Sequence, residues 1–295
     1  MEIGITQALE AKYVKMIIFR KAADITAFIT KKKRSAARIG FVPTMGALHP
    51  GHISLISESK KNSDLTICSI FVNPTQFNDK HDFEKYPKAI ENDIDLLENA
   101  GCDILFLPDM GEIYPDGTEK PPHYELGYLE RLLEGRFRPG HFQGVCQVVQ
   151  RLLDIVQPHR LYLGQKDFQQ CSVIKKLLQL TGMATEVVVC PTQRESDGLA
   201  MSSRNMRLND DERKRAVKIY ETLCFIKKQV RKGYLEDLKE RARQYLTAEG
   251  FKVDYVEIAD AVTLEPLENW DGKTLLVALI AAFLDEVRLI DNMVL

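Results

Sequence analysis

The chain has 295 residues, of which 45% are hydrophobic and 28% charged, a composition that is typical of globular proteins and excludes a disordered or fibrous chain. Its 40 basic and 42 acidic side chains leave a formal net charge of −2, which argues against a nucleic-acid-binding protein with a strongly basic face. At ~100–200 residues per domain, this length favours two domains over one.

The N-terminal residues 1–15 contain two Glu and neither a long apolar stretch nor a small-residue cleavage site, so we expect no signal peptide. The longest apolar run, residues 275–284, is far shorter than the ~20 residues of a membrane span. Cysteines occur singly, with no C-x-x-C pair and no His at metal spacing, and we expect them to be reduced core residues. They are Cys68, Cys102, Cys146, Cys171, Cys190 and Cys224. Together these features predict a cytoplasmic protein with no membrane partner.

Between residues 38 and 190, short apolar runs alternate with amphipathic patterns. Strands are predicted at 39–42, 65–72, 104–107, 161–163 and 186–190, and helices near 53–61, 89–100, 144–156 and 168–180. The third helix is the clearest, because apolar residues from Val145 to Val156 follow the i, i+3, i+4, i+7 spacing and Pro158 ends the run. This alternation predicts βαβ units and a buried parallel sheet.

After about Asp197 the pattern changes. Residues 210–232 and 235–249 are predicted to form two charged amphipathic helices, and 253–258, 275–282 and 287–290 to form strands without long helical crossovers. We therefore predict two domains, residues 1–192 and a smaller α+β domain of residues 193–295. Ligands of open α/β sheets bind outside the carboxyl ends of the strands, which directs attention to the residues just after 42, 72, 163 and 190.

The first polar constellation follows the first predicted strand and precedes a helix. His49 and His52 flank Gly51 there, so their imidazoles and the helix N–H groups can donate hydrogen bonds to phosphate. Gly46 and Gly51 allow a ligand to approach the backbone closely. The pattern is not a Walker loop, which requires G-x-x-x-x-G-K-[ST]. A glycine-rich turn with incidental histidines is the alternative interpretation.

The second constellation contains Asn73 and Gln76, neutral amides that both donate and accept and so suit a substrate with hydroxyl groups and a carboxylate. Plain Asn-Pro turn chemistry is the alternative. In the third, Lys166 is a mobile charge for phosphate, Asp167 is a candidate helix cap or ribose ligand, and Gln170 is expected to face the same cavity as Gln76. A solvated turn is the alternative here.

The fourth constellation is the polar loop that contains Ser202, Ser203 and Arg204, which are suited to clamp a phosphate group. A simple linker between domains is the alternative. All four constellations lie at predicted strand ends on one edge of the sheet. Together they provide what a nucleoside triphosphate and a small polar acid need.

H-x-G-H with a distant Ser-Ser-Arg loop resembles the signature motifs of the class I aminoacyl-tRNA synthetase and nucleotidyltransferase superfamily. The fuller set resembles one family within it, the pantothenate synthetases (pantoate–β-alanine ligases), from about residue 16 to the C-terminus. The motifs that carry this resemblance are Pro43-Thr44-Met45-Gly46-Ala47-Leu48-His49-x-Gly51-His52, Ile70-Phe71-Val72-Asn73-Pro74-x-Gln76-Phe77, Arg138-Pro139-Gly140-His141-Phe142-x-Gly144-Val145, Gly164-x-Lys166-Asp167-Phe168-Gln169-Gln170, Asp197-Gly198-Leu199-Ala200-x-Ser202-Ser203-Arg204-Asn205 and Arg288-Leu289-Ile290-Asp291-Asn292.

The resemblance implies a Rossmann-like, doubly wound α/β fold, with a nucleotide- and pantoate-binding first domain and the Ser-Ser-Arg loop at the start of the second. It also implies an ATP-dependent ligase that forms pantoyl adenylate and pyrophosphate, after which β-alanine displaces AMP. The catalytic residues would be His52, His49, Lys166 and Arg204, with His52 as proton donor or hydrogen-bond donor to the transition state. The pantoate-binding residues would be Gln76 and Gln170, with Gln76 also reached by β-alanine. The ATP-binding residues would be Met45, Gly46, Ala47, Leu48, His49, Pro50, Gly51, His52, Gly164, Gln165, Lys166, Asp167, Gln193, Met201, Ser202, Ser203 and Arg204.

Magnesium is expected with the triphosphate, held mainly by phosphate oxygens and water. Asp93 is a possible protein ligand for it, although a carboxylate on a helix surface is the favoured interpretation. Gln165 stands where an acidic residue often precedes the Lys, so Lys166 is expected to lack a neighbouring carboxylate. Residues 134–144 are a candidate lid over the adenylate. The family tends to form homodimers.

Two other functions remain open. A nucleotidyltransferase acting on a phosphorylated small molecule would share the H-x-G-H chemistry, but it would require Arg or Lys in place of Gln76 and Gln170. A non-enzymatic nucleotide-binding module would bind ATP without releasing pyrophosphate. The near-neutral charge and the small C-terminal domain disfavour a tRNA ligase.

Overall fold

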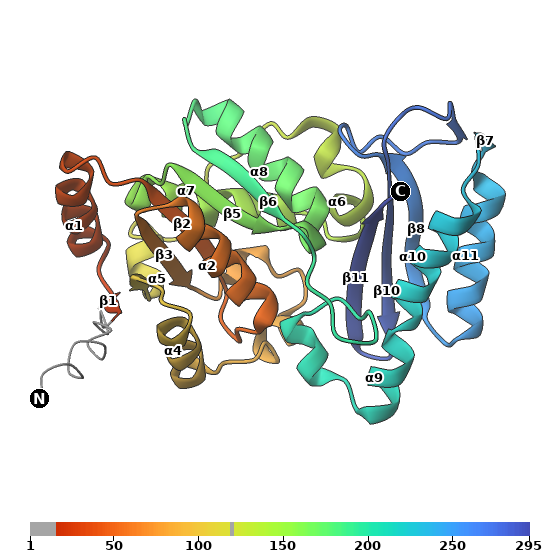
Figure 1. Cartoon of the computed structure of the whole chain (residues 1–295), viewed down its shortest axis with the longest axis horizontal. Coiled ribbons are helices and arrows are strands. Elements are labelled where there is room, and N and C mark those ends of the chain that lie inside the picture. Colours follow the sequence, from red (N-terminus) through yellow and green to blue (C-terminus); the bar gives the residue numbers. More distant parts are fainter. Residues whose placement is uncertain (1–15, 119–120) are drawn as a thin grey trace, which may run out of the picture.

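The computed structural model describes residues 16–118 and 121–295. Its larger sheet has the strand order β1-β4-β3-β2-β5-β6, and every neighbouring pair is parallel. The strands are β1 (Ile17–Phe19), β2 (Ile39–Thr44), β3 (Leu65–Ile70), β4 (Ile104–Phe106), β5 (Arg160–Gly164) and β6 (Glu186–Cys190). The predicted parallel sheet is therefore confirmed, with the edge strand β1 added to it (Figure 1).

Helices cover both faces of this sheet, because successive side chains of each strand point to opposite sides. The longer helices are α1 (Ala22–Arg34), α2 (Pro50–Asn62), α4 (Ile90–Asn99), α7 (His141–Val156) and α8 (Phe168–Thr181). Phe41 packs in a core cluster with α1, α7 and α8, whereas Val42 packs in a second cluster with α2 and α4. Shorter elements are η1 (Pro74–Gln76), α3 (Lys80–Glu84), α5 (Met110–Ile113), η2 (Gly127–Glu130), α6 (Leu133–Phe137) and η3 (Gln165–Asp167).

The strand order reverses between β2 and β5. From β2 the chain proceeds to β3 on one side, and from β5 it proceeds to β6 on the other. This makes the sheet doubly wound, and the crevice at such a switch point is the usual ligand site of the fold. The H-x-G-H segment follows β2 and the Lys166 segment follows β5, so the two lie next to each other at the carboxyl edge.

A second, antiparallel sheet has the order β11-β10-β8. Its strands are β8 (Lys252–Asp260), β10 (Leu276–Leu284) and β11 (Val287–Val294), with α9 (Asp210–Ala216), α10 (Lys218–Gln229), α11 (Glu236–Ala248), η4 (Ser203–Arg207) and the short pair β7 (Gly233–Tyr234) and β9 (Asn269–Trp270) around it. The helix predicted at 210–232 is divided at Val217. The backbone angles of Val217 stay near-helical (φ −60°, ψ −23°), so the two helices are almost continuous. The helical sequence pattern therefore gives no sign of this break.

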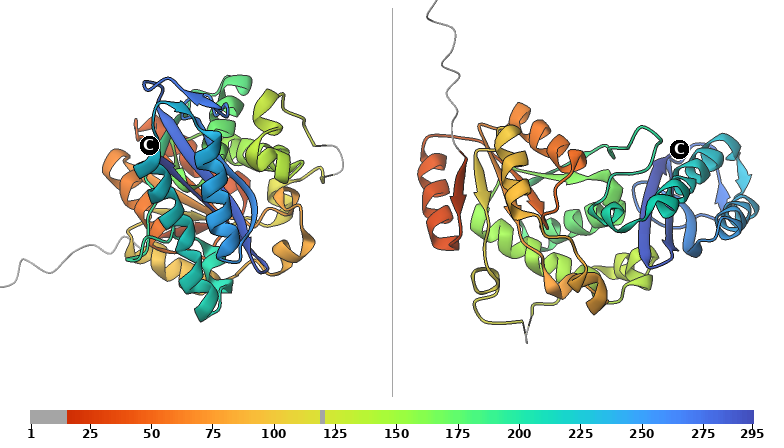
Figure 2. Two further views of the ribbon diagram at one scale, coloured as in Figure 1. Left: turned by 90° about the vertical axis from the view of Figure 1, so that its right-hand side faces the viewer. Right: turned by 90° about the horizontal axis from the view of Figure 1, so that it is seen from below.

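The second sheet is buried on both faces. One face packs against α10 and α11 through residues such as Ile258 and Ile280. The other contributes Tyr255, Leu279 and Ala281 to the core cluster that also contains α7 and α8. Figures 1 and 2 show this sheet between its own helices and the body formed by the larger sheet. The two sheets therefore share a continuous apolar core.

The cysteines are all free thiols, and five of them are buried as predicted, whereas Cys224 is only half-buried. Across residues 16–118 and 121–295, the helices lack the length and apolar character required to cross a membrane. The expectations for residues 1–15 concern a segment outside the described residues.

Candidate active site

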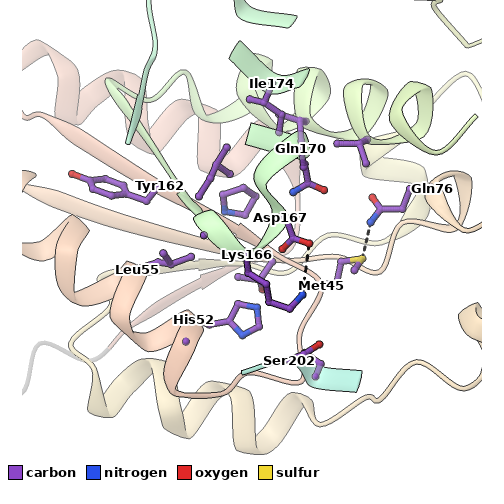
Figure 3. Close-up of a pocket in the computed structure, with 18 of the residues that line it drawn as sticks. Met45, His52, Leu55, Gln76, Tyr162, Lys166, Asp167, Gln170, Ile174 and Ser202 are labelled. Atoms are coloured by element: carbon purple, nitrogen blue, oxygen red, sulfur yellow. Dashed lines mark hydrogen bonds and ion pairs between the residues drawn. The ribbon is translucent and has the colours of Figure 1, made fainter. Parts of the chain in front are cut away.

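A pocket of about 220 Å³ opens at the switch point of the parallel sheet, and side chains from all four predicted constellations line it (Figure 3). The predicted residues in its lining are Met45, His49, Gly51, His52, Gln76, Gly164, Lys166, Asp167, Gln170, Gln193, Met201, Ser202, Ser203 and Arg204. The predicted residues Gly46, Ala47, Leu48, Pro50 and Gln165 do not line it. The first three of these are buried residues of the loop between β2 and α2, and they do not face the cavity.

The two histidines of the first constellation are held by the start of α2. His49 is the N-cap, and its Nδ1 accepts a hydrogen bond from the N–H of Gly51 at 3.2 Å. The N–H of His49 donates to Nδ1 of His52 at 3.4 Å. Because both Nδ1 atoms accept, each ring carries its proton on Nε2. A Cβ on Gly51 would lie 2.8 Å from the His49 ring, which explains the glycine between them.

Both imidazoles are neutral near pH 7. Burial, followed by the charge of Lys166, lowers the pKa of His49 to about 4. Burial, His49 and Lys166 together lower the pKa of His52 to about 3. A neutral ring with its proton on Nε2 donates a hydrogen bond without carrying charge. This protonation state favours a hydrogen-bonding role for His52 over a role as proton donor.

We therefore predict that neither histidine titrates between pH 8 and pH 5 in the free protein. Folding lowers both pKa values below the 6.5 of an unperturbed imidazole, so the unfolded chain binds protons first. The contribution of the two neutral histidines to the free energy of unfolding is therefore complete above about pH 6.5, and it is lost as the pH falls toward 3. Imidazole ¹⁵N chemical shifts measure this directly, with urea-unfolded protein as the control. A midpoint near 6.5 for either ring in the folded protein would contradict the prediction.

The loop before α2 is held by Asp93, which corrects our expectation of a surface carboxylate. Asp93 is fully buried, and its Oδ2 and Oδ1 accept the N–H groups of Ala47 at 2.9 Å and Leu48 at 2.7 Å. Burial raises the pKa of this carboxyl. From the other side, the hydroxyl of Ser203 donates to the carbonyl of Ala47 at 3.0 Å. Asp93 and Ser203 thus fix a residue whose φ of 48° lies in the left-handed region.

The amide side chains lie on different elements around the pocket. Gln76 Nε2 contacts Met45 Sδ at 3.0 Å, and Gln76 Oε1 accepts from Asn73 at 3.2 Å. Gln170 reaches the same cavity from α8, and Figure 3 shows Gln76, Gln170 and His52 arranged around Lys166. The polar atoms of Gln76 and Gln170 can therefore bind one small ligand together.

Lys166 lies in η3, the single turn between β5 and α8. Its Nζ is 3.8 Å from Asp167 Oδ1, so it does have a neighbouring carboxylate even though Gln165 is neutral. Asp167 occupies the N-cap position of α8 but makes no capping hydrogen bond, which overturns one of the two roles considered for it. Its carboxylate instead lines the pocket.

Arg204 is paired with an acidic residue that the sequence analysis did not identify. Its Nη2 and Nε donate to Asp82 at 2.7 and 3.3 Å, and Arg207 donates to the same carboxylate at 2.8 Å. Although burial opposes it, hydrogen bonds from Arg204 lower the pKa of Asp82. Two arginines thus share one carboxylate, which leaves a net positive charge beside Ser202 at the pocket.

The candidate lid at 134–144 is an anchored segment. The Glu134 carboxylate is buried, and it accepts two hydrogen bonds of 2.8 Å from Arg288 and one of 2.9 Å from the hydroxyl of Tyr255. Phe142, which follows in the same segment, belongs to the shared core. These contacts join the segment to the second sheet, so it is a wall of the site.

Comparison with known proteins decides which family has this arrangement. The sequence model of the family described as pantoate-beta-alanine ligase matches residues 17–294. The chain belongs to the pantoate–β-alanine ligase family. A pantothenate synthetase of Cytophaga hutchinsonii is 44% identical over 283 residues, covering 95% of this chain and 99% of the relative. One of Pseudothermotoga lettingae is 46% identical over 93% of this chain and 98% of the relative.

Solved structures of pantoate–β-alanine ligases also match. The pantothenate synthetase of Thermus thermophilus has a TM-score of 0.86 at 39% identity, with 94% of this chain and 99% of that chain covered. The ligase of Francisella tularensis, complexed with a β,γ ATP compound and β-alanine, has a TM-score of 0.79 at 40% identity, with 95% and 97% covered. The chain and these ligases therefore share both fold and length.

The sequence of this ligase did not indicate that Arg138 and His141 form a hydrogen-bonded chain to Gln76 at the pocket. Arg138 Nη1 donates to His141 Nε2 at 3.0 Å, and His141 Nδ1 donates to the carbonyl of Gln76 at 2.7 Å. Burial and then the charge of Arg138 lower the pKa of His141 to about 3, so this ring is also neutral. The R-P-G-H-F motif was visible in the sequence, but nothing in it indicated contact with Gln76.

Proposed function

We propose that this ligase joins pantoate to β-alanine in the switch-point pocket, at the expense of ATP and through a pantoyl adenylate. One observation carries the proposal: two neutral imidazoles, Lys166, the loop of residues 202–204 and a pair of neutral amides line a single cavity of about 220 Å³. Such a cavity provides hydrogen-bond donors and positive charge for a triphosphate. It also provides neutral groups for the hydroxyls and carboxylate of pantoate.

In the first step, a carboxylate oxygen of pantoate attacks the α-phosphorus of ATP, the bond to the β-phosphate oxygen breaks, and pyrophosphate leaves. The Nε2–H groups of His52 and His49 would donate to the phosphate oxygens on which charge develops. Lys166 with Ser202 and Arg204 would neutralise the leaving pyrophosphate. Gln76 and Gln170 would hold pantoate in line for attack. Catalysis then consists of positioning and charge stabilisation.

In the second step, the amine of β-alanine attacks the acyl carbon of the adenylate, its extra proton is released, and AMP leaves. Gln76 would contact β-alanine as well as pantoate. Gly164 and Asp167 would meet the ribose and adenine side of the nucleotide, and the backbone of Gln193 the adenine. Support comes from the Francisella tularensis relative, whose structure holds both an ATP compound and β-alanine.

For magnesium, residues 16–118 and 121–295 contain no group of three or more His, Cys, Asp or Glu side chains arranged to hold a metal ion. Both oxygens of Asp93 are occupied by backbone N–H groups, so this carboxylate does not suit the ion. We propose that Mg²⁺ enters with ATP, bound by phosphate oxygens and water. We also propose a cytoplasmic homodimer with a domain boundary near residue 192.

The two half-reactions test this function. With ATP and pantoate alone, the protein should release pyrophosphate in an amount close to that of its active sites. AMP should appear only when β-alanine is added. A phosphorylated acceptor in place of pantoate is the control, and turnover with it would favour a nucleotidyltransferase. ATP binding without pyrophosphate release would leave only a nucleotide-binding module.

A further inference from the structure

The R-L-I-D-N motif at residues 288–292 has no part in the mechanism above, although its last residue touches the active-site turn. Asn292 lies on β11, the edge strand of the second sheet, and is only 2% exposed. Its Nδ2 donates to the carbonyl of Gln165 at 3.0 Å and to the carbonyl of Lys166 at 2.9 Å. Gln165 Nε2 donates back to Asn292 Oδ1 at 3.3 Å. One buried amide thus binds the turn that carries Lys166.

The neighbouring residue fixes the strand from which Asn292 reaches. Asp291 accepts two hydrogen bonds from Arg194, at 2.6 and 3.0 Å, and also accepts the N–H of Asn292 at 2.7 Å. Arg194 donates in addition to the carbonyl of Asn292 at 3.2 Å. Its guanidinium stacks over Tyr220, 4.5 Å from the ring centroid. The backbone at residue 292 is therefore held on two sides.

The turn itself needs external hydrogen bonds. η3 spans only Gln165–Asp167, and a single 3₁₀ turn has poor internal hydrogen bonding. A lysine side chain is a flexible four-carbon stem, so the backbone below it decides where its ammonium can reach. The amide nitrogen of Asn292 carries two N–H donors, so it can satisfy both carbonyls at once.

We propose that Asn292 is a positioning residue that aims Lys166 at the triphosphate from across the boundary between the two sheets. This inference rests on the proposed function, in which Lys166 contacts ATP. Asn292 binds the two backbone carbonyls of the turn and the side chain of Gln165, and it does not line the pocket of about 220 Å³. Of the two residues that it contacts in the turn, only Lys166 lines that pocket, so its effect on ATP passes through Lys166.

The test is calorimetric binding of a non-hydrolysable ATP analogue to the full chain. Asn292→Ala should weaken binding about tenfold, the equivalent of one lost hydrogen-bonding interaction. In a Lys166→Ala background the same substitution should weaken it no further. Asn292→Asp, which keeps the shape but cannot donate, should weaken it at least as much, and it carries the test if the alanine variant does not fold.

Met293→Ala is the matched control. Met293 follows Asn292 on the same strand and packs against the α10–α11 cluster, so its loss should lower the melting temperature without changing ATP affinity. Equal effects of the Met293 and Asn292 variants, or additive effects of Asn292→Ala and Lys166→Ala, would overturn the inference. If Lys166→Ala alone leaves ATP binding unchanged, the proposed role of Lys166 is wrong, which is a separate failure.

Discussion

Replacing His52 with alanine is expected to slow pyrophosphate release from ATP and pantoate by about 10²–10³-fold, the usual effect of removing one preorganised donor from a developing oxyanion. His52 is half-buried at the pocket and its Nδ1 bond is long, at 3.4 Å, so the fold should be little affected. Stopped-flow detection of pyrophosphate measures the effect. His123→Ala is the matched control, because this side chain is 63% exposed and does not line the pocket.

A second substitution separates hydrogen bonding from proton transfer. His52→Gln places an N–H donor close to the position of the imidazole Nε2 but has no titratable group. Because the pKa of His52 is lowered to about 3, we expect glutamine to recover a substantial part of the rate lost in the alanine variant. No recovery would favour proton donation. An alanine variant with nearly unimpaired rate would remove His52 from the mechanism.

Replacing Glu134 with alanine is expected to lower the free energy of unfolding by about 3–5 kcal/mol, because it leaves the guanidinium of Arg288 buried without its main partner. The hydroxyl of Tyr255 loses its acceptor as well. Urea unfolding near pH 7 measures the loss. Glu286→Ala is the control, since it breaks an ion pair with Lys85 whose side chains are 52% and 77% exposed, and should cost at most about 1 kcal/mol.

The carboxylate of Glu134 also makes the free energy of unfolding depend on pH. Burial alone would raise the pKa of Glu134, but Arg288 lowers it to about 2, below the ordinary value of 4.5. Its contribution is therefore complete above about pH 4.5 and is lost as the pH falls toward 2. The stability difference between wild type and Glu134→Ala should narrow over that range. A difference that stays constant from pH 7 to pH 2.5 would contradict the assigned charge pair.

Much of the parallel sheet could be predicted because its central strands are short, nearly continuous apolar runs, although β2 continues through Pro43 to Thr44 rather than ending at the proline. β1 escaped prediction since it has three residues and leaves Ile17 and Ile18 41% and 40% exposed at the sheet edge. The break at Val217 was also invisible, because its backbone angles stay near-helical. Short edge elements carry too little periodicity to be recognised.

The residues that line the pocket at the carboxyl edge were predictable for a different reason. Parallel strands bring their carboxyl ends together, so the residues that follow each strand lie close to one another. The residues that hold that edge in place could not be predicted from the sequence. Asp93 resembles a helix-surface carboxylate in the sequence, and only the fold shows that it binds backbone N–H groups 45 and 46 positions away. Arg288 and Asn292 reach their partners from 154 and 126 to 127 positions away, across two sheets.

The continuous core below both sheets has a consequence for how this chain can be divided. The inner face of the antiparallel sheet contributes Tyr255, Leu279 and Ala281 to the apolar cluster of α7 and α8. Cutting the polypeptide near residue 192 would expose that hydrophobic surface to water and leave the charge of Glu134 without its partner. The C-terminal third is therefore not an independent unit. A chimera that takes this part from a homologue must also take the residues of α7 and α8 that pack against it.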